Sequence, residues 1–378
     1  MKITWIVPHF LPHIGGGEKL YYDVCRQLVK RGCQVRVVTS SSGGIKGHRR
    51  IKGLDVFYCD WPLIFGHPLV KTSDIVKHVR WADIVHTTIY STAIKTNLAS
   101  AFYNKKCITT IHEVMGDKWF WFEKNPVKAH AFRIYEKLII SLCPYVHAVS
   151  RATARDFGKY RGRCRHLFQI YNYLQLPTAS VVEKEDIDFR EFFSLKDGEK
   201  GILYFGRPAK NKGIFVLLKA IAAIKDKPTI RGKARFCMIL ADEPIDGRKE
   251  VMEFIADNGL LDMVSIRSSL PRTKLLKVIS QNDLCVIPSI TEGFGYSAAE
   301  ACALKRPVIA SDGGSLKEVV SGKCRFFKNM DSRDLAEKLS DYIKYGTMGF
   351  LEIPERTFDR DKIIDQYMKM YRYLYKEK

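Results

Sequence analysis

Long apolar runs are missing from this sequence of 378 residues, and so is the pattern of a signal peptide. It contains no stretch of about 18 or more apolar residues of the kind that crosses a membrane. The first residues, Met-Lys-Ile-Thr-Trp-Ile-Val-Pro, lack the order of basic, apolar and small residues typical of a secretory signal. We therefore expect a cytoplasmic protein, either in solution or peripheral on the membrane.

Metal and redox motifs are also missing. The ten cysteines stand singly, without a Cys-x-x-Cys pair or the close His/Cys spacing of a zinc site. Most lie among apolar residues, as Cys285 does in Asp-Leu-Cys-Val-Ile, which predicts reduced residues in the core. An Asp-x-Asp at Asp186 and Asp188 stands in an acidic stretch rather than after a strand, so we interpret it as solvated. We expect no cofactor and no metal.

Acidic residues are scarce in the first half of the chain. Residues 1–180 hold 27 lysines and arginines against 11 aspartates and glutamates, and the whole chain carries a net charge of +21. Such a surplus favours an anionic partner, such as a membrane surface or a phosphorylated acceptor, or it is a solvated basic face without a partner. No helix-turn-helix, zinc finger or RNA-binding signature accompanies it, so nucleic acid is not expected.

What the sequence does contain is a regular alternation of short apolar runs with longer amphipathic stretches. It starts with an apolar run at Ile3–Val7, a glycine turn, a predicted helix over Lys19–Lys30 and a second predicted strand at Gln34–Thr39. Alternation of this kind is typical of βαβ units and a parallel sheet. After a polar stretch it restarts at Gly201–Phe205. The sequence therefore predicts an α/β fold of two doubly wound, Rossmann-like domains that face each other across a cleft.

The length also supports two domains, because one hydrophobic core rarely grows beyond about 250–300 residues. We place the first domain at residues 1–176, a linker at 177–200 and the second domain at 201–356. The remaining residues, 357–378, include an amphipathic pattern over Arg360–Tyr375 that predicts a helix. We expect this helix to pack back across the region where the domains meet.

A glycine cluster follows the first predicted strand, and ligands of parallel α/β sheets bind at the carboxyl ends of strands. Gly15, Gly16 and Gly17 lead into a helix, where bare backbone and the helix N-terminus favour phosphate. Leu20 stands where a GxGxxG fingerprint needs its last glycine, so a nicotinamide cofactor is not indicated. The glycines either approach a ligand closely or form an ordinary tight turn.

Two cations follow the strand that opens the second domain. Arg207 comes directly after Tyr-Phe-Gly, and Lys212 stands five residues later beside Gly213 at a predicted helix start. Arginine offers a planar fork of donors and lysine a mobile point charge, a combination that can clamp a diphosphate. The alternative is a pair of solvated surface cations.

Paired carboxylates form the strongest pattern, after the strand that ends at Pro288. A glycine-rich loop carries Glu292, and a helix that begins near Tyr296 carries Glu300. Loop amides and the helix N-terminus can hold phosphate, while carboxylates accept hydrogen bonds from sugar and ribose hydroxyls. In the first domain, His112 follows a predicted strand, where a lone histidine is either structural or part of a site.

Taken together, these motifs resemble a retaining glycosyltransferase of family 4, the group-1 glycosyl transferases, which have the two-domain GT-B fold. The resemblance spans nearly the whole chain, and its hallmark is a pair of glutamates with seven intervening residues, here Glu292 and Glu300. It implies that Glu300 binds the ribose hydroxyls of a UDP- or GDP-linked donor and that Glu292 lies near the donor sugar. It also implies that Arg207 and Lys212 hold the diphosphate.

Further roles follow from the same resemblance. Amides around Phe294 and Gly295 would help to hold the diphosphate, and Gly16 and Gly17 would approach it from the first domain. His112 would contact the donor sugar beside the reaction centre. Cationic side chains can stabilise the leaving diphosphate without a metal. The family is thought to displace it from the same face, with the leaving phosphate helping to deprotonate the acceptor.

The acceptor is expected on the basic first domain, as a glycan, a polysaccharide precursor or a lipid-linked sugar. Two segments there combine cations with glycines or aromatics, a predicted loop at 43–52 and the run Lys-Trp-Phe-Trp-Phe-Glu-Lys at 118–124. Such aromatics suit a membrane interface or stacking on sugar rings, or they pack in the core. We expect an anionic membrane surface as a further partner.

Other functions on the same fold stay open. One is a related enzyme, an epimerase or a phosphorylase, which would act on the nucleotide-sugar alone or with free phosphate. The other is a catalytically silent protein that binds an anionic surface. The paired glutamates favour sugar transfer to an acceptor over both.

Overall fold

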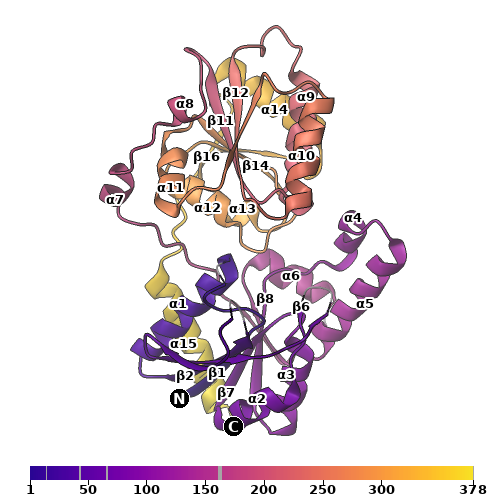
Figure 1. The fold of residues 1–378 in the computed structure, drawn as a ribbon, viewed down its shortest axis with the longest axis vertical. Coiled ribbons are helices and arrows are strands. Elements are labelled where there is room, and N and C mark those ends of the chain that lie inside the picture. The colour runs from indigo at the N-terminus through magenta and orange to yellow at the C-terminus, as the bar shows by residue number, and fades with distance from the viewer. Residues whose placement is uncertain (14, 42–43, 65–66, 161–163, 378) are drawn as a thin grey trace. The chain divides into compact units, whose positions relative to one another are not determined.

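The computed structural model describes residues 1–13, 15–41, 44–64, 67–160 and 164–377. The chain divides into two compact units, Met1–Tyr173 with Phe358–Lys378 and Leu174–Thr357. Each unit has its own mostly parallel sheet with helices on both faces, as the ribbon in Figure 1 shows. The α/β class and the two Rossmann-like domains predicted from the sequence are confirmed.

The sheet of the first unit has, among the described residues, eight strands in the order β10-β9-β8-β7-β1-β2-β4-β3. Paired neighbours are parallel, except that β3 runs antiparallel to β4. The order reverses between β1 and β7, which is the position where doubly wound sheets bind ligands. The strands are Lys2–Ile6 (β1), Gln34–Ser40 (β2), Gly47–Ile51 (β3), Leu54–Cys59 (β4), Ile84–Thr88 (β7), Lys106–Ile111 (β8), Tyr145–Ala148 (β9) and His166–Gln169 (β10).

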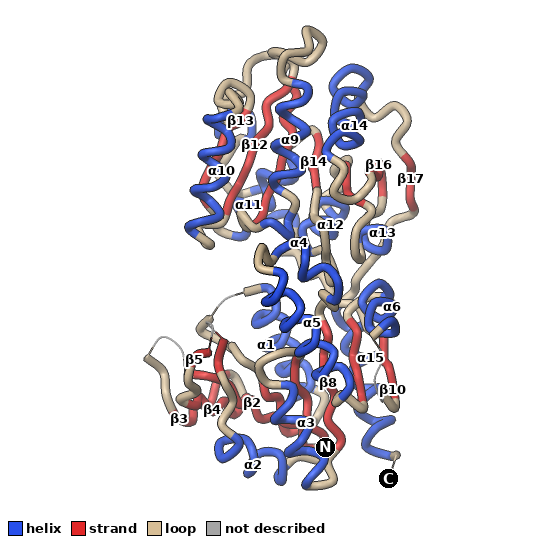
Figure 2. The backbone as a smooth tube through the Cα atoms, turned by 90° about the vertical axis from the view of Figure 1, so that its right-hand side faces the viewer, coloured by secondary structure: helices blue, strands red, loops and turns tan. Residues whose placement is uncertain are grey.

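Helices cover both faces of this sheet, as the tube in Figure 2 shows. On one face, α1 packs with the terminal helix α15, whose Tyr367 and Tyr371 join Trp5 of β1 in one buried cluster. On the other face, α2 and α3 bury Val85 and Val38. The helices are Gly16–Lys30 (α1), Thr72–Trp81 (α2), Ala93–Phe102 (α3), Trp119–Phe122 (α4), Pro126–Ser141 (α5), Arg151–Lys159 (α6) and Arg360–Lys376 (α15); shorter elements are Leu63–Ile64 (β5), His67–Pro68 (β6) and the 3-10 turn Gly116–Lys118.

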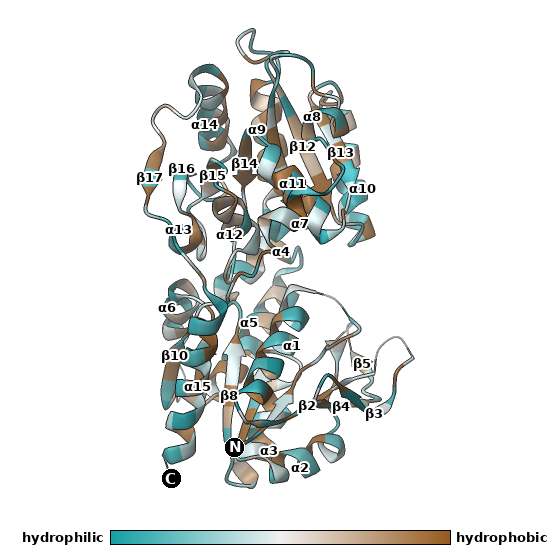
Figure 3. Cartoon of the chain, turned by 90° about the vertical axis from the view of Figure 1, so that its left-hand side faces the viewer, coloured by the Kyte–Doolittle hydropathy of each residue, from teal (hydrophilic) through white to brown (hydrophobic). Residues whose placement is uncertain are grey.

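The sheet of the second unit has the order β13-β12-β11-β14-β15-β16-β17, parallel except for β17 against β16. Its order reverses between β11 and β14. The central strand β14 is wholly buried and is coloured as apolar in Figure 3, as expected for a strand covered on both faces. The strands are Lys200–Gly206 (β11), Ala234–Leu240 (β12), Val264–Ser268 (β13), Leu284–Ile287 (β14), Val308–Ser311 (β15), Gly322–Phe327 (β16) and Leu351–Ile353 (β17).

The helices of the second unit begin where capping residues and glycines stand in the sequence. The Asp331 side chain accepts hydrogen bonds from the first amides of α14, and Gly213, in the left-handed region, caps α9. They are Ala179–Glu183 (α7), Phe189–Phe192 (α8), Ile214–Ile224 (α9), Ile245–Asp257 (α10), Arg272–Gln281 (α11), Tyr296–Ala303 (α12), Leu316–Val319 (α13) and Ser332–Tyr345 (α14), with a 3-10 turn at Lys210–Lys212.

Three segments differ from a simple interpretation of the sequence. The stretch at 177–200, proposed as a linker, forms α7 and α8 and is part of the second unit. The terminal helix belongs to the first unit. The segment at 43–52, predicted as a loop, contains the exposed edge strand β3, while Gly43 lies outside the described residues. That strand lacks an apolar alternation because an edge strand of this kind buries neither face.

Candidate active site

The carboxyl ends of β11 and β14 bring four of the predicted charged residues to one place in the second unit. This is the point at which the strand order of the sheet reverses. A small pocket of about 30 Å³ lies here, and its lining includes Gly206, Lys212, Ser289 and Ser297. Residues that are about 80 positions apart in sequence therefore share one end of the sheet.

Arg207 and Lys212 both follow β11. Arg207 is exposed and forms no ion pair with any described residue, so its guanidinium is available to an anion. Lys212 ends the 3-10 turn that leads into α9. The next residue, Gly213, has φ +68, and a Cβ there would overlap the carbonyl oxygen of Pro288. A glycine is therefore needed to hold Lys212 against the loop that follows β14.

Glu292 lies in that loop and holds Lys212. Its Oε1 accepts hydrogen bonds from Lys212 Nζ at 2.7 Å and from Ser289 Oγ at 2.9 Å. The backbone of Glu292 is enclosed as well, since its carbonyl accepts from the amide of Ser315 and a Cβ at Gly314 would meet its backbone atoms. The carboxylate is thus fixed in position, with Oε2 left for another partner.

Glu300 lies on the first turns of α12, after Phe294 and Gly295. Phe294 is buried, and Gly295 has φ +89, so the chain turns sharply into the helix N-terminus. Such a terminus attracts phosphate. The Glu300 side chain is 9% exposed and its Oε1 lies 2.7 Å from Nη1 of Arg272 on α11. No motif in the sequence points to Arg272, because its pairing with Glu300 arises from the packing of α11 beside α12.

In the first unit, Gly16 and Gly17 begin α1 directly after the loop that leaves β1. A Cβ at Gly16 would have no atom within 4 Å, and one at Gly17 would have only the Tyr21 ring at 3.7 Å. These glycines are therefore not required by packing within the described residues. The backbone at the start of α1 is bare, which suits the close approach of a ligand.

His112 follows β8 and is held by α1. The hydroxyl of Tyr21 hydrogen-bonds Nε2 of His112 and lies 3.3 Å from Thr88 Oγ1, and the His112 carbonyl accepts from Thr153 Oγ1. Burial lowers the pKa of His112 to about 4, so the imidazole is neutral at neutral pH. Nδ1 has no hydrogen-bond partner among the described residues. Tyr21 was not singled out in the sequence, where it looks like an ordinary core residue of an amphipathic helix.

The aromatic run at 118–124 does not pack in the core. Phe120 and Trp121 of α4 are 38% and 48% exposed, while Trp119 donates from Nε1 to the buried carboxylate of Glu136. Among the described residues, no group of three or more His, Cys, Asp or Glu side chains is arranged to hold a metal ion. Within the residues that the structure describes, no helix is long and apolar enough to cross a membrane.

Comparison with known families covers both units. The model of the glycosyl transferases group 1 matches residues 185–349, and the model of glycosyltransferase family 4 matches residues 14–174. A GDP-mannose:cellobiosyl-diphosphopolyprenol alpha-mannosyltransferase of Xanthomonas oryzae pv. oryzae is 25% identical over 324 residues, which are 82% of this chain and 79% of the relative.

Solved structures share the fold over the full length. HepE of Anabaena, in complex with UDP and glucose, superposes with a TM-score of 0.71 at 18% identity, covering 99% of this chain and 100% of HepE. Sucrose-phosphate synthase of Thermosynechococcus elongatus gives the same TM-score and identity over 99% of each chain. The chain has the GT-B fold and belongs to the group-1 glycosyl transferases of the family-4 type.

Proposed function

We propose that the protein transfers a hexose from a nucleoside-diphosphate sugar to a glycan or lipid-linked acceptor, with retention of the anomeric configuration and without a metal ion. The observation that carries this proposal is the group formed by Arg207, Lys212, Glu292 and Glu300 at the switch point of the second unit. It combines cations for a diphosphate with carboxylates for hydroxyls. Such a combination matches the two ends of a nucleotide-sugar.

The donor nucleotide would bind to the second unit. Glu300, fixed by Arg272, accepts hydrogen bonds from the ribose hydroxyls, and the amides around Phe294 and Gly295 at the start of α12 contact the diphosphate. Arg207, which has no acidic partner among the described residues, pairs with phosphate oxygens. Lys212 does the same while Glu292 keeps its ammonium group in place, and Oε2 of Glu292 accepts from a sugar hydroxyl.

The reaction breaks the bond between the anomeric carbon and the phosphate oxygen and forms a bond from that carbon to an acceptor oxygen on the same face. The acceptor proton moves to an oxygen of the leaving diphosphate. Negative charge grows on the diphosphate during this step, and Arg207 and Lys212 stabilise it from fixed positions. For this reason no metal is required in the proposed mechanism.

The first unit would supply the remaining groups. Neutral His112 presents Nδ1 to a hydroxyl of the donor sugar, because Tyr21 already occupies Nε2. The bare backbone of Gly16 and Gly17 approaches the donor phosphates. The Xanthomonas relative uses GDP-mannose and a diphosphopolyprenol-linked acceptor, and HepE was solved with UDP and glucose. We accordingly propose a UDP- or GDP-linked hexose and an acceptor carried on a lipid or a glycan.

A lipid-linked acceptor requires access to the membrane, and α4 and α5 offer a surface for it. Besides its buried side, which includes Ile139 and Ile140, α5 has an apolar stripe on the opposite side, where Val127, Ile134 and Leu138 are 76%, 61% and 50% exposed. Residues spaced by seven and four positions share one face of a helix.

Cations flank this apolar stripe. Lys124, Lys128 and Lys137 are exposed and have no ion-pair partner among the described residues. Exposed apolar side chains bordered by unpaired lysines are typical of a surface that rests on anionic lipid. We propose that the protein works at the cytoplasmic membrane surface through α4 and α5, not in solution alone.

The transfer assay supplies labelled UDP-hexoses and GDP-hexoses together with polyprenol-linked saccharides, in EDTA. We expect incorporation from donors of one base into the lipid fraction, with an NMR-determined anomeric configuration that matches the donor. Glu300→Ala and Arg207→Ala should abolish it, and the exposed arginine at the opposite end of the sheet, changed by Arg231→Ala, should leave it intact. Donor turnover of equal rate without any acceptor would instead indicate an epimerase or a hydrolase.

The membrane proposal is tested by sedimentation with vesicles that contain phosphatidylglycerol or only phosphatidylcholine. Binding to the anionic vesicles should fall with added salt and should be lost in Ile134→Glu/Leu138→Glu. The matched control is Leu98→Glu, because Leu98 is 53% exposed on α3 of the same unit. Equal binding by the double variant and the wild type would contradict the assignment of α5.

A further inference from the structure

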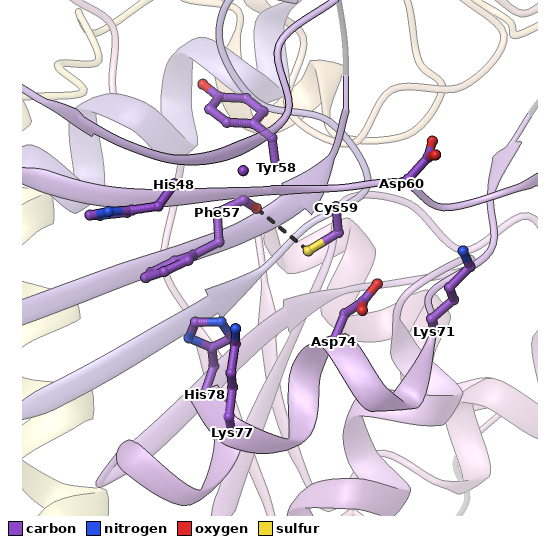
Figure 4. A pocket seen from close by; sticks show the side chains of 10 residues that line it. His48, Phe57, Tyr58, Cys59, Asp60, Lys71, Asp74, Lys77 and His78 are labelled. Atoms are coloured by element: carbon purple, nitrogen blue, oxygen red, sulfur yellow. Dashed lines mark hydrogen bonds between the residues drawn. The ribbon is translucent and has the colours of Figure 1, made fainter.

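A second pocket, of about 380 Å³, lies in the first unit and shares no residue with the site at His112. It opens between the β3–β4 hairpin and α2, and Figure 4 shows its lining side chains. His48 and Phe57 come from the hairpin, and Lys77 and His78 from α2. The Tyr58 ring points to the other side of the sheet, where its hydroxyl donates to the carbonyl of Leu11.

One wall of the pocket is aromatic. The rings of His48 and Phe57 stack with their centroids 4.6 Å apart and their planes 20° apart, and His78 lies below at 4.2 Å from Phe57. His48 is held by Asp55 at 3.0 Å, yet its side chain is 51% exposed. A half-exposed ring fixed in this way offers a flat surface for the C–H face of a sugar ring.

His78 is the unusual residue of this pocket. It is 2% exposed, and neither Nδ1 nor Nε2 has a hydrogen-bond partner. Burying both nitrogens without partners costs free energy. Burial, with help from Lys77, Arg36 and His48, lowers the pKa of His78 to about 4, so the ring is neutral and offers one donor and one acceptor. The two nitrogens point in different directions, so a sugar hydroxyl can pair with one of them, donating to the bare nitrogen or accepting from the N–H.

The charges around the pocket are not balanced. Lys71 and Lys77 have no ion-pair partner among the described residues. The acidic residues are already engaged, since Asp60 pairs with Lys46 at 3.0 Å and Asp74 accepts from Trp61 Nε1 at 3.0 Å. Trp61 is a neutral donor and does not cancel the charge of Asp74, so the lining residues together with Lys46 carry one positive charge in excess. This excess favours a ligand with a negative charge.

We infer that this pocket is a binding site for a negatively charged sugar, a uronic acid residue, separate from the donor site. The ring would lie against His48 and Phe57, its carboxylate would pair with Lys71 and Lys77, and a hydroxyl would reach His78. The volume is in the range of small-molecule sites and exceeds what a single water or inorganic anion fills. This inference does not rest on the proposed transferase activity.

The site binds its sugar without reacting with it. Cys59 contributes a thiol to the lining, and burial raises its pKa to about 11, so the thiol stays protonated at neutral pH. Its sulfur is directed to the carbonyl oxygen of Phe57, as the dashed line in Figure 4 shows. Retention of an acidic glycan on the first unit is therefore the role that the chemistry supports.

The test is ligand-observed NMR titration of the full chain with glucuronic acid, glucose, glucose 6-phosphate and inorganic phosphate, with UDP affinity measured in parallel. Glucuronic acid should bind at least about fivefold more tightly than glucose. Lys71→Ala/Lys77→Ala should remove that preference, whereas His78→Phe should weaken the binding of both sugars. The exposed pair Lys30→Ala/Lys369→Ala should change nothing. UDP affinity should be the same in all variants, and urea unfolding followed by tryptophan fluorescence shows that the first unit folds, because all five tryptophans lie there.

Three results would overturn the inference. Equal binding of glucose and glucuronic acid would remove the role of the lysines. Inorganic phosphate that displaces glucuronic acid completely at equal concentration would reduce the pocket to a simple anion site, and tighter binding of glucose 6-phosphate would point to a phosphorylated sugar instead. Failure of UDP to bind while glucuronic acid binds as expected would contradict the proposed function and leave this site standing.

Discussion

The ion pair between Lys212 and Glu292 should couple the two strand ends that form the donor site, and a double-mutant cycle can measure that coupling. The changes are Lys212→Met, Glu292→Gln and both together, which remove charge while keeping side-chain size. The pair lies 2.7 Å apart with side chains 24% and 11% exposed, so it is neither a surface pair nor a fully buried one.

The expected magnitude follows from this geometry. At 2.7 Å and an effective dielectric constant of about 20, the Coulomb attraction is about 6 kcal/mol before costs. Ordering the lysine side chain opposes it by up to about 2 kcal/mol, and partial desolvation of both charges removes more. We therefore expect a coupling of about 1–2 kcal/mol, above the 0.2–1 kcal/mol typical of exposed pairs.

The assay can isolate the second unit because all five tryptophans lie in the first. Urea unfolding followed by circular dichroism should report the loss of stability in each single variant, while tryptophan fluorescence should report an unchanged first unit. The control cycle uses Lys249 and Glu253, which lie 3.7 Å apart with side chains 76% and 58% exposed, and should give less than about 0.5 kcal/mol. A coupling for Lys212 and Glu292 no larger than the control value would refute this reasoning.

Three further changes have expected outcomes. In urea unfolding, Gly213→Ala should destabilise the second unit by more than about 1 kcal/mol. Gly232→Ala should cost less, because Gly232 has nearly the same φ (+69 against +68) but open space around it. Equal costs would show that the Pro288 contact is unimportant. The free energy of unfolding should fall as pH drops from about 6.5 to 4, because His112 and His147 have folded pKa values near 4 and the unfolded chain takes up protons first. At pH 5 each histidine should lower the free energy of unfolding by on the order of 2 kcal/mol. A free energy of unfolding that stays constant over this pH range in urea titrations would contradict their neutral burial. His112→Ala should lower kcat, while the Kd for the nucleoside diphosphate changes less than about threefold. A large loss of nucleotide binding in calorimetry would contradict the proposed contact of His112 with the donor sugar.

The fold could be predicted from the sequence where burial dictates the residue pattern. Strands such as β14, buried on both faces, appear as short apolar runs, and glycines or capping residues mark where helices begin. The antiparallel hairpin of β3 and β4 could not be predicted, because the residues of β3 are mostly exposed and mostly polar. The position of such an edge strand is determined by its pairing with the neighbouring strand rather than by its own composition.

The candidate site shows the same division. Arg207, Lys212, Glu292 and Glu300 stand directly after strands, so their positions at one end of the sheet follow from strand order alone. Their partners do not: Arg272 on α11 and Tyr21 on α1 contact Glu300 and His112 only through the packing of separate elements. The pocket at His48 and His78 is likewise invisible in the sequence, since two unpartnered nitrogens are a property of the folded environment.

The most direct measurement is calorimetric titration of the purified protein with UDP, GDP and ADP in EDTA, repeated with Glu300→Ala, Arg207→Ala and the control Arg231→Ala. We expect one base to bind preferentially, with affinity lost by at least about tenfold in the first two variants and kept in the control. Absence of binding by every nucleotide, or equal binding by all four proteins, would contradict the placement of the donor site at the ends of β11 and β14.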